Sequence, residues 1–134
     1  MKLVICVDER YGMSFLGRRQ SMDAAVQQRI LALTEGSRLW MSPYSAKQFA
    51  PAQLPACEDF LQKAGQGEYC LVETEDIAPW IDRVEAVIVY HWNRHYPSDL
   101  VFPVELFEKR WKRVSCWEFA GIAHERITEE VYIV

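Results

Sequence analysis

The sequence contains few of the residues that build metal centres, nucleotide-binding loops and disulfide frameworks. Its 134 residues include three histidines, six glycines and four cysteines. The cysteines, at positions 6, 57, 70 and 116, match no C-x-x-C zinc or redox motif. All but Cys57 lie inside apolar or aromatic runs, where a reduced cysteine behaves as a small hydrophobe. This pattern favours a reducing compartment, and we expect a cytoplasmic protein.

Long apolar segments and an excess of basic charge are also missing. The first apolar run, residues 3–7, is too short for a signal peptide or a membrane span, so we expect no membrane partner. The net charge of -4 at pH 7 disfavours a broad electrostatic surface for nucleic acid, and we do not expect a nucleic-acid partner. The sequence is compatible with a homodimer.

The residues that are present have the composition of one folded domain. Half of them are apolar and 13% are aromatic, which supports a packed core. A chain of 134 residues suits one such core, so we expect a single domain over residues 1–134.

One strongly helical pattern stands near the start of the chain. We predict a helix over residues 21–34, with Ser21 as its N-cap. Gly36 is placed to take a left-handed C-cap. The buried stripe is predicted from four apolar residues at helical spacing, which are Met22, Val26, Ile30 and Leu33.

Strands and loops alternate around this helix in the order typical of an α/β protein. Strands are predicted over residues 3–7, 38–42, 68–74, 85–92, 111–120 and 124–134. Short helical turns are predicted over residues 44–49 and 75–84, and loops over residues 8–17 and 93–108. The last two strands meet at Gly121 as a hairpin. This order predicts a three-layer α/β/α sandwich with a mixed, mostly parallel sheet and a C-terminal antiparallel hairpin.

The order of several motifs resembles that of the dihydrofolate reductase family. In that family a first strand leads to an acidic residue and a glycine-hydrophobic loop, and a helix ending in Thr-x-Gly precedes a strand with a phosphate-binding turn. Residues 4–15 and 31–45 carry the counterparts here, while residues 98–119 and 127–134 resemble the family's C-terminal strands. The resemblance covers the first fifty and the last forty residues, and it implies a dihydrofolate-reductase-like fold.

Three places that serve ligands in that family hold other residues here. Ala25, Val26 and Gln27 occupy the helix positions of the family's carboxylate. Residues 42–45 replace its Gly-Arg-x-Thr phosphate turn, and residues 87–95 stand where a central strand should lead into a Gly-Gly turn. Without small residues, the backbone cannot come close to phosphate oxygens. We therefore expect no NADPH site and no cofactor.

Residues 12–23 and 39–49 also resemble a family of small bacterial proteins that often carries the label ribonuclease Z. Genuine ribonuclease Z enzymes hold metal ions with a His-x-His-x-Asp-His cluster. The histidines of this chain, His91, His95 and His124, cannot build that cluster, and we expect no metal.

The first candidate site lies in the loop before the predicted helix, at Arg18, Arg19, Ser21 and Asp23. Free N–H groups and the helix dipole favour an anion there, and the two arginines could make bidentate contacts with phosphate or carboxylate. Asp23 could orient one arginine or accept a hydrogen bond from a ligand amine. The simpler alternative is that Ser21 caps the helix, Asp23 meets its dipole, and the arginines are solvated.

A second candidate site lies at the carboxyl end of the strand predicted over residues 85–92. Ligands of open α/β sheets gather at the carboxyl ends of the strands. His91 could act there as an acid or base, with Arg94 beside it. His91 and His95 are four residues apart, which would suit a metal ion on a helix. The alternative is a polar loop with Trp92 packed at the rim of the domain.

Two further patterns have structural explanations. Ser42 and Lys47 could pair as an activated nucleophile, although a capped turn accounts for both residues. The five tryptophans are more typical of core or interface positions than of stacking platforms for bases.

These patterns predict a small domain that binds an anionic or heterocyclic ligand, or that acts as an interaction module, without an NADPH site. A divergent nucleotide- or pterin-directed reductase that uses Asp23, Arg18 or Arg19, and His91 is the first alternative. An RNA-processing role is the second, and the acidic balance of the chain disfavours it.

Overall fold

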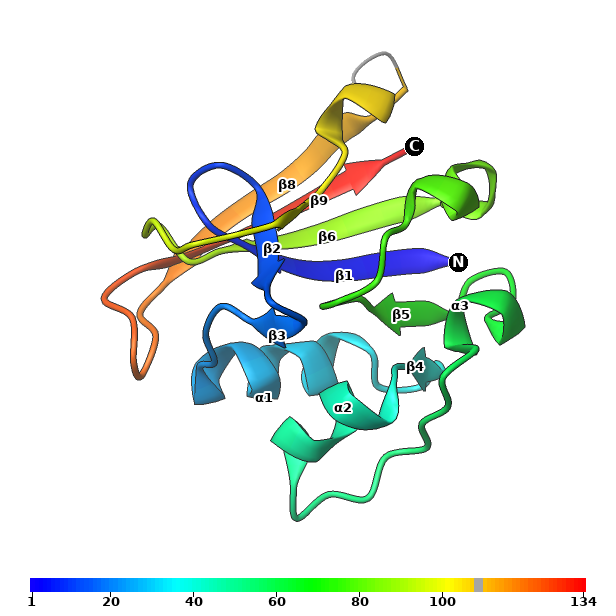
Figure 1. Cartoon of the computed structure of the whole chain (residues 1–134), viewed down its shortest axis with the longest axis horizontal. Helices are drawn as coiled ribbons and strands as arrows, with labels where there is room; N and C mark the ends of the chain where they lie inside the picture. The colour runs from blue at the N-terminus through cyan, green and yellow to red at the C-terminus, as the bar shows by residue number, and fades with distance from the viewer. Residues whose placement is uncertain (108–109) are drawn as a thin grey trace.

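Figure 1 shows the computed structural model, which describes residues 1–107 and 110–134. The elements, with 3-10 turns labelled η, are β1 (Lys2–Val7), β2 (Gly12–Phe15), β3 (Arg18–Arg19), α1 (Ala24–Leu33), β4 (Leu39–Trp40), α2 (Pro43–Ala46), η1 (Lys47–Phe49), α3 (Phe60–Lys63), β5 (Tyr69–Leu71), η2 (Ala78–Arg83), β6 (Ala86–His91), β7 (Leu100–Val101), η3 (Val104–Leu106), β8 (Lys112–Phe119) and β9 (Ile127–Ile133). Within the described ranges, no helix has both the length and the apolar character needed to cross a membrane.

The main sheet has six strands in the order β4-β5-β1-β6-β9-β8. β4, β5, β1 and β6 are parallel, and β9 and β8 continue the sheet in antiparallel orientation. This arrangement confirms the predicted mixed, mostly parallel sheet with its C-terminal antiparallel hairpin. Because neighbouring parallel strands point the same way, β4, β5, β1 and β6 all end at one edge of the sheet.

Two apolar clusters cover the two faces of this sheet. Successive side chains of β1 alternate between them, with Leu3 and Ile5 in one cluster and Val4 in the other. α1 packs on the Val4 face through Val26 and Ile30, whereas α3, η2 and η3 contribute to the opposite cluster. Each large side chain buried in this way stabilises the fold by roughly 1.5–3 kcal/mol. The helices on both faces confirm the predicted three layers.

The two segments predicted as loops, residues 8–17 and 93–108, contain β2 and β7, which form a second sheet together with β3, in the order β3-β2-β7. Gly12 allows the close packing of β2, because a Cβ at this position would lie 2.7 Å from the Cβ of Ser98. These strands have two to four residues, which is too short for a readable alternation of apolar and polar positions. The last residue of the second predicted loop, Glu108, lies outside the described residues.

The predicted start of the long helix is wrong by two residues. α1 begins at Ala24, and Asp23 is its N-cap in place of Ser21. Met22 therefore precedes the helix, and it is 49% exposed instead of joining the buried stripe. Serine and aspartate are comparable N-caps, so local preference alone does not choose between them.

Smaller differences concern the strands. The strand predicted over residues 38–42 is reduced to the two residues of β4, because Ser42 already caps α2. Cys116, which we expected in an apolar run, is exposed on β8, the outer strand of the main sheet. Gly36 adopts the predicted left-handed backbone, with φ at +84°, but the C-cap of α1 is Thr34, two residues earlier.

Candidate functional site

Polar side chains gather along the edge of the main sheet where β4, β5, β1 and β6 end. Ligands of open α/β sheets bind at this edge. The chain runs along it from Asp8, directly after β1, to Asp23, the cap of α1. Charged groups of this segment meet groups from other strands in several separate clusters.

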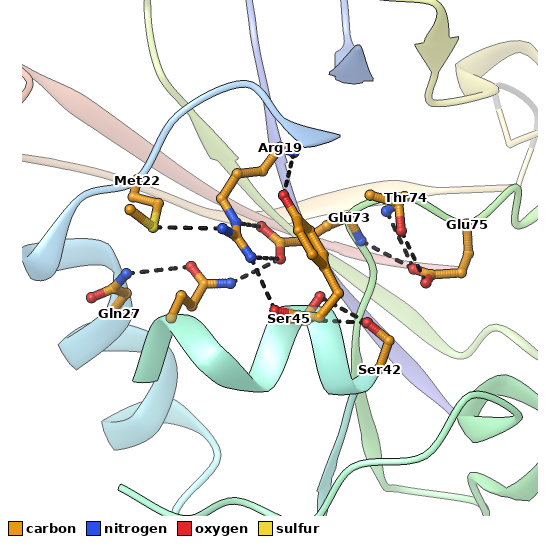
Figure 2. Close-up of polar contacts among 10 residues, drawn as sticks. Arg19, Met22, Gln27, Ser42, Ser45, Glu73, Thr74 and Glu75 are labelled. Carbon is orange, nitrogen blue, oxygen red and sulfur yellow. Dashed lines mark hydrogen bonds and ion pairs between the residues drawn. The ribbon is translucent and has the colours of Figure 1, made fainter. Parts of the chain in front are cut away.

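The first cluster contains an ion pair between Arg19 of β3 and Glu73, which follows β5 (Figure 2). Arg19 Nε lies 3.0 Å from Glu73 Oε2, and Arg19 Nη2 lies 3.2 Å from Glu73 Oε1. Only 17% of the Arg19 side chain and 7% of the Glu73 side chain are exposed. The bidentate face of Arg19, which we predicted to hold a ligand anion, thus binds a carboxylate of the chain itself.

Neighbouring side chains enclose this ion pair on two sides. The Arg19 guanidinium lies 4.3 Å from the centre of the Tyr44 ring and donates to the Tyr44 carbonyl at 3.3 Å. Gln48 Nε2 donates to Glu73 Oε1 at 2.8 Å and its carbonyl accepts from Gln27 at 3.3 Å. Figure 2 shows the cluster between α1, α2 and the turn after β5, with its polar groups directed at one another.

The serine and lysine at the start and end of α2 do not form a nucleophilic pair. The Ser42 hydroxyl accepts from the backbone N–H of Ser45 at 3.1 Å and caps α2. No hydrogen bond joins Ser42 to Lys47 in the part of the chain that the structure describes. The capped turn is the observed arrangement.

Asp8 organises the loop that follows β1. Its carboxylate accepts from the backbone N–H groups of Arg10, Gly12 and Tyr96 at 2.8–3.2 Å, and from Gln20 Nε2 at 3.2 Å. Burial raises the pKa of Asp8, but these hydrogen bonds to the ionised form lower it by more, so the pKa lies below its usual value. The role of this carboxylate is to hold residues 8–20 against the edge of the sheet.

The second cluster joins the start of α1 to the turn between β8 and β9. The Asp23 carboxylate, in a residue only 2% exposed, accepts from His124 Nδ1 at 3.0 Å. It also accepts from the backbone N–H groups of Ala25, Ile122, Ala123 and His124 at 2.8–3.0 Å. Burial raises the pKa of Asp23, but these donors lower it to about 2.

The imidazole of His124 is held on its other sides as well. Its Nε2 lies 3.1 Å from Ser21 Oγ and 3.0 Å from the Tyr96 hydroxyl. The Trp92 ring stacks on it at 4.5 Å, and His124 is 3% exposed. Sequence reasoning did not assign His124 to the site. Its only signal was a histidine at the start of the last predicted strand, about a hundred residues from the serine and aspartate it binds.

His91 belongs to a different group of charges. Its Nε2 lies 2.5 Å from Glu130 Oε1, and Arg113 Nη1 lies 2.9 Å from Glu130 Oε2. Burial raises the pKa of Glu130, but Arg113 and His91 lower it by more, and the net shift is downward. His95 is exposed and lies 3.9 Å from Asp8 Oδ2. Among the described residues, no group of three or more His, Cys, Asp or Glu side chains is placed to hold a metal ion.

A groove of about 650 Å³ opens at the carboxyl end of β6. Its walls carry two arginines and two glutamates, with aromatic and small residues between them: Trp92, Asn93, Arg94, Glu118, Phe119, Ala120, Glu125 and Arg126. Arg94 Nη2 lies 3.5 Å from the Ala123 carbonyl, and its guanidinium forms no ion pair with a residue that the structure describes. Arg126 lies 3.8 Å from Glu118, and both side chains are more than half exposed.

The six candidate residues are thus distributed over several sites. Ser21 and Asp23 are brought together by His124, and Arg94 reaches the same β8–β9 turn through Ala123. Arg19 is paired with Glu73. Arg18 is exposed beside a smaller hollow of about 320 Å³, and His91 binds Glu130. The predicted alternatives in which Ser21 caps the helix and Trp92 sits on an outer rim do not match the structure.

Both strands that flank β1 lead into turns without glycine. The turn after β5 begins with Glu73, Thr74, Glu75 and Asp76. After β6, the backbone N–H of Trp92 donates to the Val7 carbonyl at 2.9 Å. The sequence places the counterpart of the Gly-Gly turn after β6, and the structure adds the turn after β5 as a second position, because β5 and β6 both neighbour β1.

No protein-family profile and no curated protein sequence matches the chain. Among solved structures, dihydrofolate reductase from Enterococcus faecalis, in complex with NADP(H) and RAB-propyl, is similar to it with a TM-score of 0.69. The match covers 98% of this chain and 94% of that chain at 11% sequence identity. A likeness at this identity concerns the backbone arrangement alone. The chain therefore has the fold of dihydrofolate reductase, as the order of its motifs predicted.

Proposed function

We propose that this protein binds a small, flat, anionic ligand in the groove at the carboxyl end of β6, and that it does so without a nicotinamide dinucleotide. Arg94 carries the proposal. Its guanidinium lines the groove and pairs with no carboxylate among the described residues. A guanidinium with available donors in a concave site favours a carboxylate or phosphate group.

The other walls of the groove suit the rest of such a ligand. Phe119 supplies aromatic surface and Asn93 lies beside it, whereas Trp92 is only 3% exposed and reaches the groove with little of its surface. The ion pair between Arg126 and Glu118 is long and exposed, so Arg126 can exchange its partner for a ligand at little cost. A groove of about 650 Å³ is within the usual size range of small-molecule sites.

The turns after β5 and β6 do not fit the phosphates of a dinucleotide. In the turn after β5, Glu73 is already paired with Arg19, the carboxylates of Glu75 and Asp76 repel phosphate, and no glycine lets the backbone approach. In the dihydrofolate reductase family the helix carries a carboxylate at a position that corresponds here to Ala25, Val26 or Gln27. None of these residues is acidic, and Val26 is only 2% exposed in the apolar core. These observations favour a binding module over the reductase alternative.

Thermal unfolding with defined probes tests the proposal. Nicotinate and adenosine 5′-monophosphate are flat and anionic, and NADPH tests the reductase alternative. A probe at 100 times its Kd stabilises the folded state by about 2.7 kcal/mol. We expect at least one of the first two to raise the Tm of the wild type but not of R94A. The R18A variant removes the same charge at an exposed position elsewhere and should respond as the wild type does.

Other outcomes would favour other functions. Stabilisation by NADPH that persists in R94A would contradict the proposal and support a reductase. Binding of RNA that weakens steeply with salt would support the RNA-processing alternative. An equal response of R94A and the wild type to every probe would place the site outside the groove.

A further inference from the structure

We propose that Ser21 is a nucleophile, with His124 as its general base and Asp23 as the residue that positions His124, so that the start of α1 is an acyl-transfer site. His124 Nε2 lies 3.1 Å from Ser21 Oγ, and His124 Nδ1 lies 3.0 Å from Asp23 Oδ2. Serine, histidine and aspartate connected in this way form a catalytic triad by geometry and role, whatever their order in the chain.

The surroundings hold the imidazole in the form that a base needs. An ionised Asp23 can only accept, so the Nδ1 atom of His124 carries the hydrogen and its Nε2 atom offers a lone pair to the hydroxyl. The Trp92 ring, stacked at 4.5 Å, fixes the plane of the imidazole. Asp23 is held in turn by backbone N–H groups of the β8–β9 turn, including those of Ile122 and Ala123.

Tyr96 makes a second contact with the same nitrogen. Its hydroxyl lies 3.0 Å from His124 Nε2, close to the 3.1 Å of the Ser21 contact. One lone pair on Nε2 cannot serve both hydroxyls fully, so Ser21 and Tyr96 compete for it. The activation of Ser21 therefore depends on how far Tyr96 is engaged, for example by a substrate that displaces its hydroxyl.

A hollow beside this cluster suggests the class of substrate. It measures about 320 Å³, and Tyr96 and Gln20, the residue before Ser21, both line it. The remaining walls are the apolar residues Phe15, Leu16 and Pro97, with Arg18 and Arg19 beside them. The substrate assigned to this site is a carboxylic ester with a small apolar acyl group.

The chemical step follows from these contacts. The Ser21 hydroxyl proton moves to His124 Nε2 as Oγ bonds to the ester carbonyl carbon, and the C–O bond to the alcohol breaks as the alcohol takes that proton. Water then attacks the acyl-serine with the same base, which releases the acid and restores the hydroxyl. The backbone N–H of Met22 donates to no residue in the described ranges and can serve the oxyanion, since it follows the nucleophile.

Labelling with diisopropyl fluorophosphate tests the nucleophile directly, because Ser21 Oγ would bond to phosphorus as fluoride leaves and His124 takes the proton. We expect one adduct per chain, located on Ser21 by peptide mass mapping and absent in S21A. The matched control S115A removes an exposed hydroxyl on β8 and should be labelled as the wild type is. H124Q should react about 10²–10⁴-fold more slowly, and Y96F should react faster than the wild type.

A second variant keeps the test valid if H124Q fails to fold. S21C places a thiol against His124 Nε2, and a thiol beside an imidazole ionises below its usual range. At about pH 6, S21C should react with iodoacetamide at least about tenfold faster than S115C, with the site assigned by mass mapping. Labelling that S21A does not abolish, or equal rates for S21C and S115C, would overturn the proposal and leave Asp23 and His124 as a clip for the β8–β9 turn.

Discussion

The two halves of the sheet edge at which the parallel strands end use the same residue types in opposite ways. Over β4 and β5, Arg19 is enclosed and paired in bidentate fashion with Glu73. Over β6 and β9, Arg94 lines a groove of about 650 Å³, and its guanidinium donates only to the Ala123 carbonyl, at 3.5 Å, among the described residues. The residue type therefore does not distinguish a structural arginine from one that is a candidate for ligand binding. The group that the guanidinium contacts does distinguish them.

This difference separates stability from binding. The Arg19–Glu73 pair is largely buried at the edge of the sheet. Removal of one partner there leaves the other charge without compensation. Arg94 makes no such contribution, so its replacement should affect ligands and leave the fold intact. The following variants would break or sharpen this contrast, in order of decreasing expected effect.

Replacement of Glu73 should have the largest effect. Glu73→Gln removes the charge opposite Arg19 and weakens the hydrogen bond from Gln48, and we expect it to lower the free energy of unfolding by about 3 kcal/mol. Urea unfolding at pH 7 measures this loss. Asp82→Asn removes one negative charge from a fully exposed side chain and should leave the unfolding midpoint unchanged. Equal midpoints for the two variants would show that the buried pair does not stabilise the edge.

Asp23→Asn should cost about 2 kcal/mol, because the hydrogen bonds to a charged acceptor are weakened. The pKa of Asp23 is lowered from 3.8 to about 2 in the folded state. Its stabilisation is therefore present above about pH 4 and is lost as the pH falls toward 2, because Asp23 is harder to protonate in the folded state than in the unfolded state. Urea unfolding from pH 5 to pH 2 should decline less steeply in Asp23→Asn than in the wild type. Parallel declines would contradict this role of Asp23.

Arg94→Lys keeps the charge but removes the planar fork of donors. We expect it to weaken the binding of the nicotinate or adenosine 5′-monophosphate probe by about tenfold, or about 1.4 kcal/mol. The unfolding midpoint without ligand should not change. Isothermal titration calorimetry checks the affinity, and an affinity equal to that of the wild type would mean that Arg94 acts only as a point charge.

Glu118→Gln should have the smallest effect. It removes the exposed partner of Arg126, and such surface pairs contribute about 0–1 kcal/mol. Stability should stay nearly constant, while the anionic probe should bind slightly more tightly because one carboxylate has left the groove. Weaker binding in this variant would indicate that Glu118 itself contacts the ligand.

The layered architecture was predictable because its signals are local. The apolar run over residues 3–7 has the length of a buried strand, and Val26 and Ile30 recur at helical spacing. The order of motifs in the first and last parts of the chain added the family likeness. Short strands such as β2 and β7 gave no such signal, because their pairing depends on a partner some ninety residues away.

The candidate sites were less predictable because they, too, depend on contacts between residues that are far apart in the sequence. Arg19 and Arg94 look alike in the sequence, and only the contact with Glu73 separates them. Ser21 and Asp23 are both good caps, and the choice between them is linked to His124 and the β8–β9 turn, which donate to Asp23 across about a hundred residues. Chemical type and local spacing carry no record of such long-range contacts.

The measurement that tests the central claim most directly is a titration with nicotinate followed by the backbone amide resonances of the ¹⁵N-labelled protein. The account predicts saturable shifts confined to residues 92–94, 118–120 and 125–126 around the groove, which disappear in R94A. Saturable shifts centred on Arg19 and Glu73, with the groove residues unchanged, would contradict it.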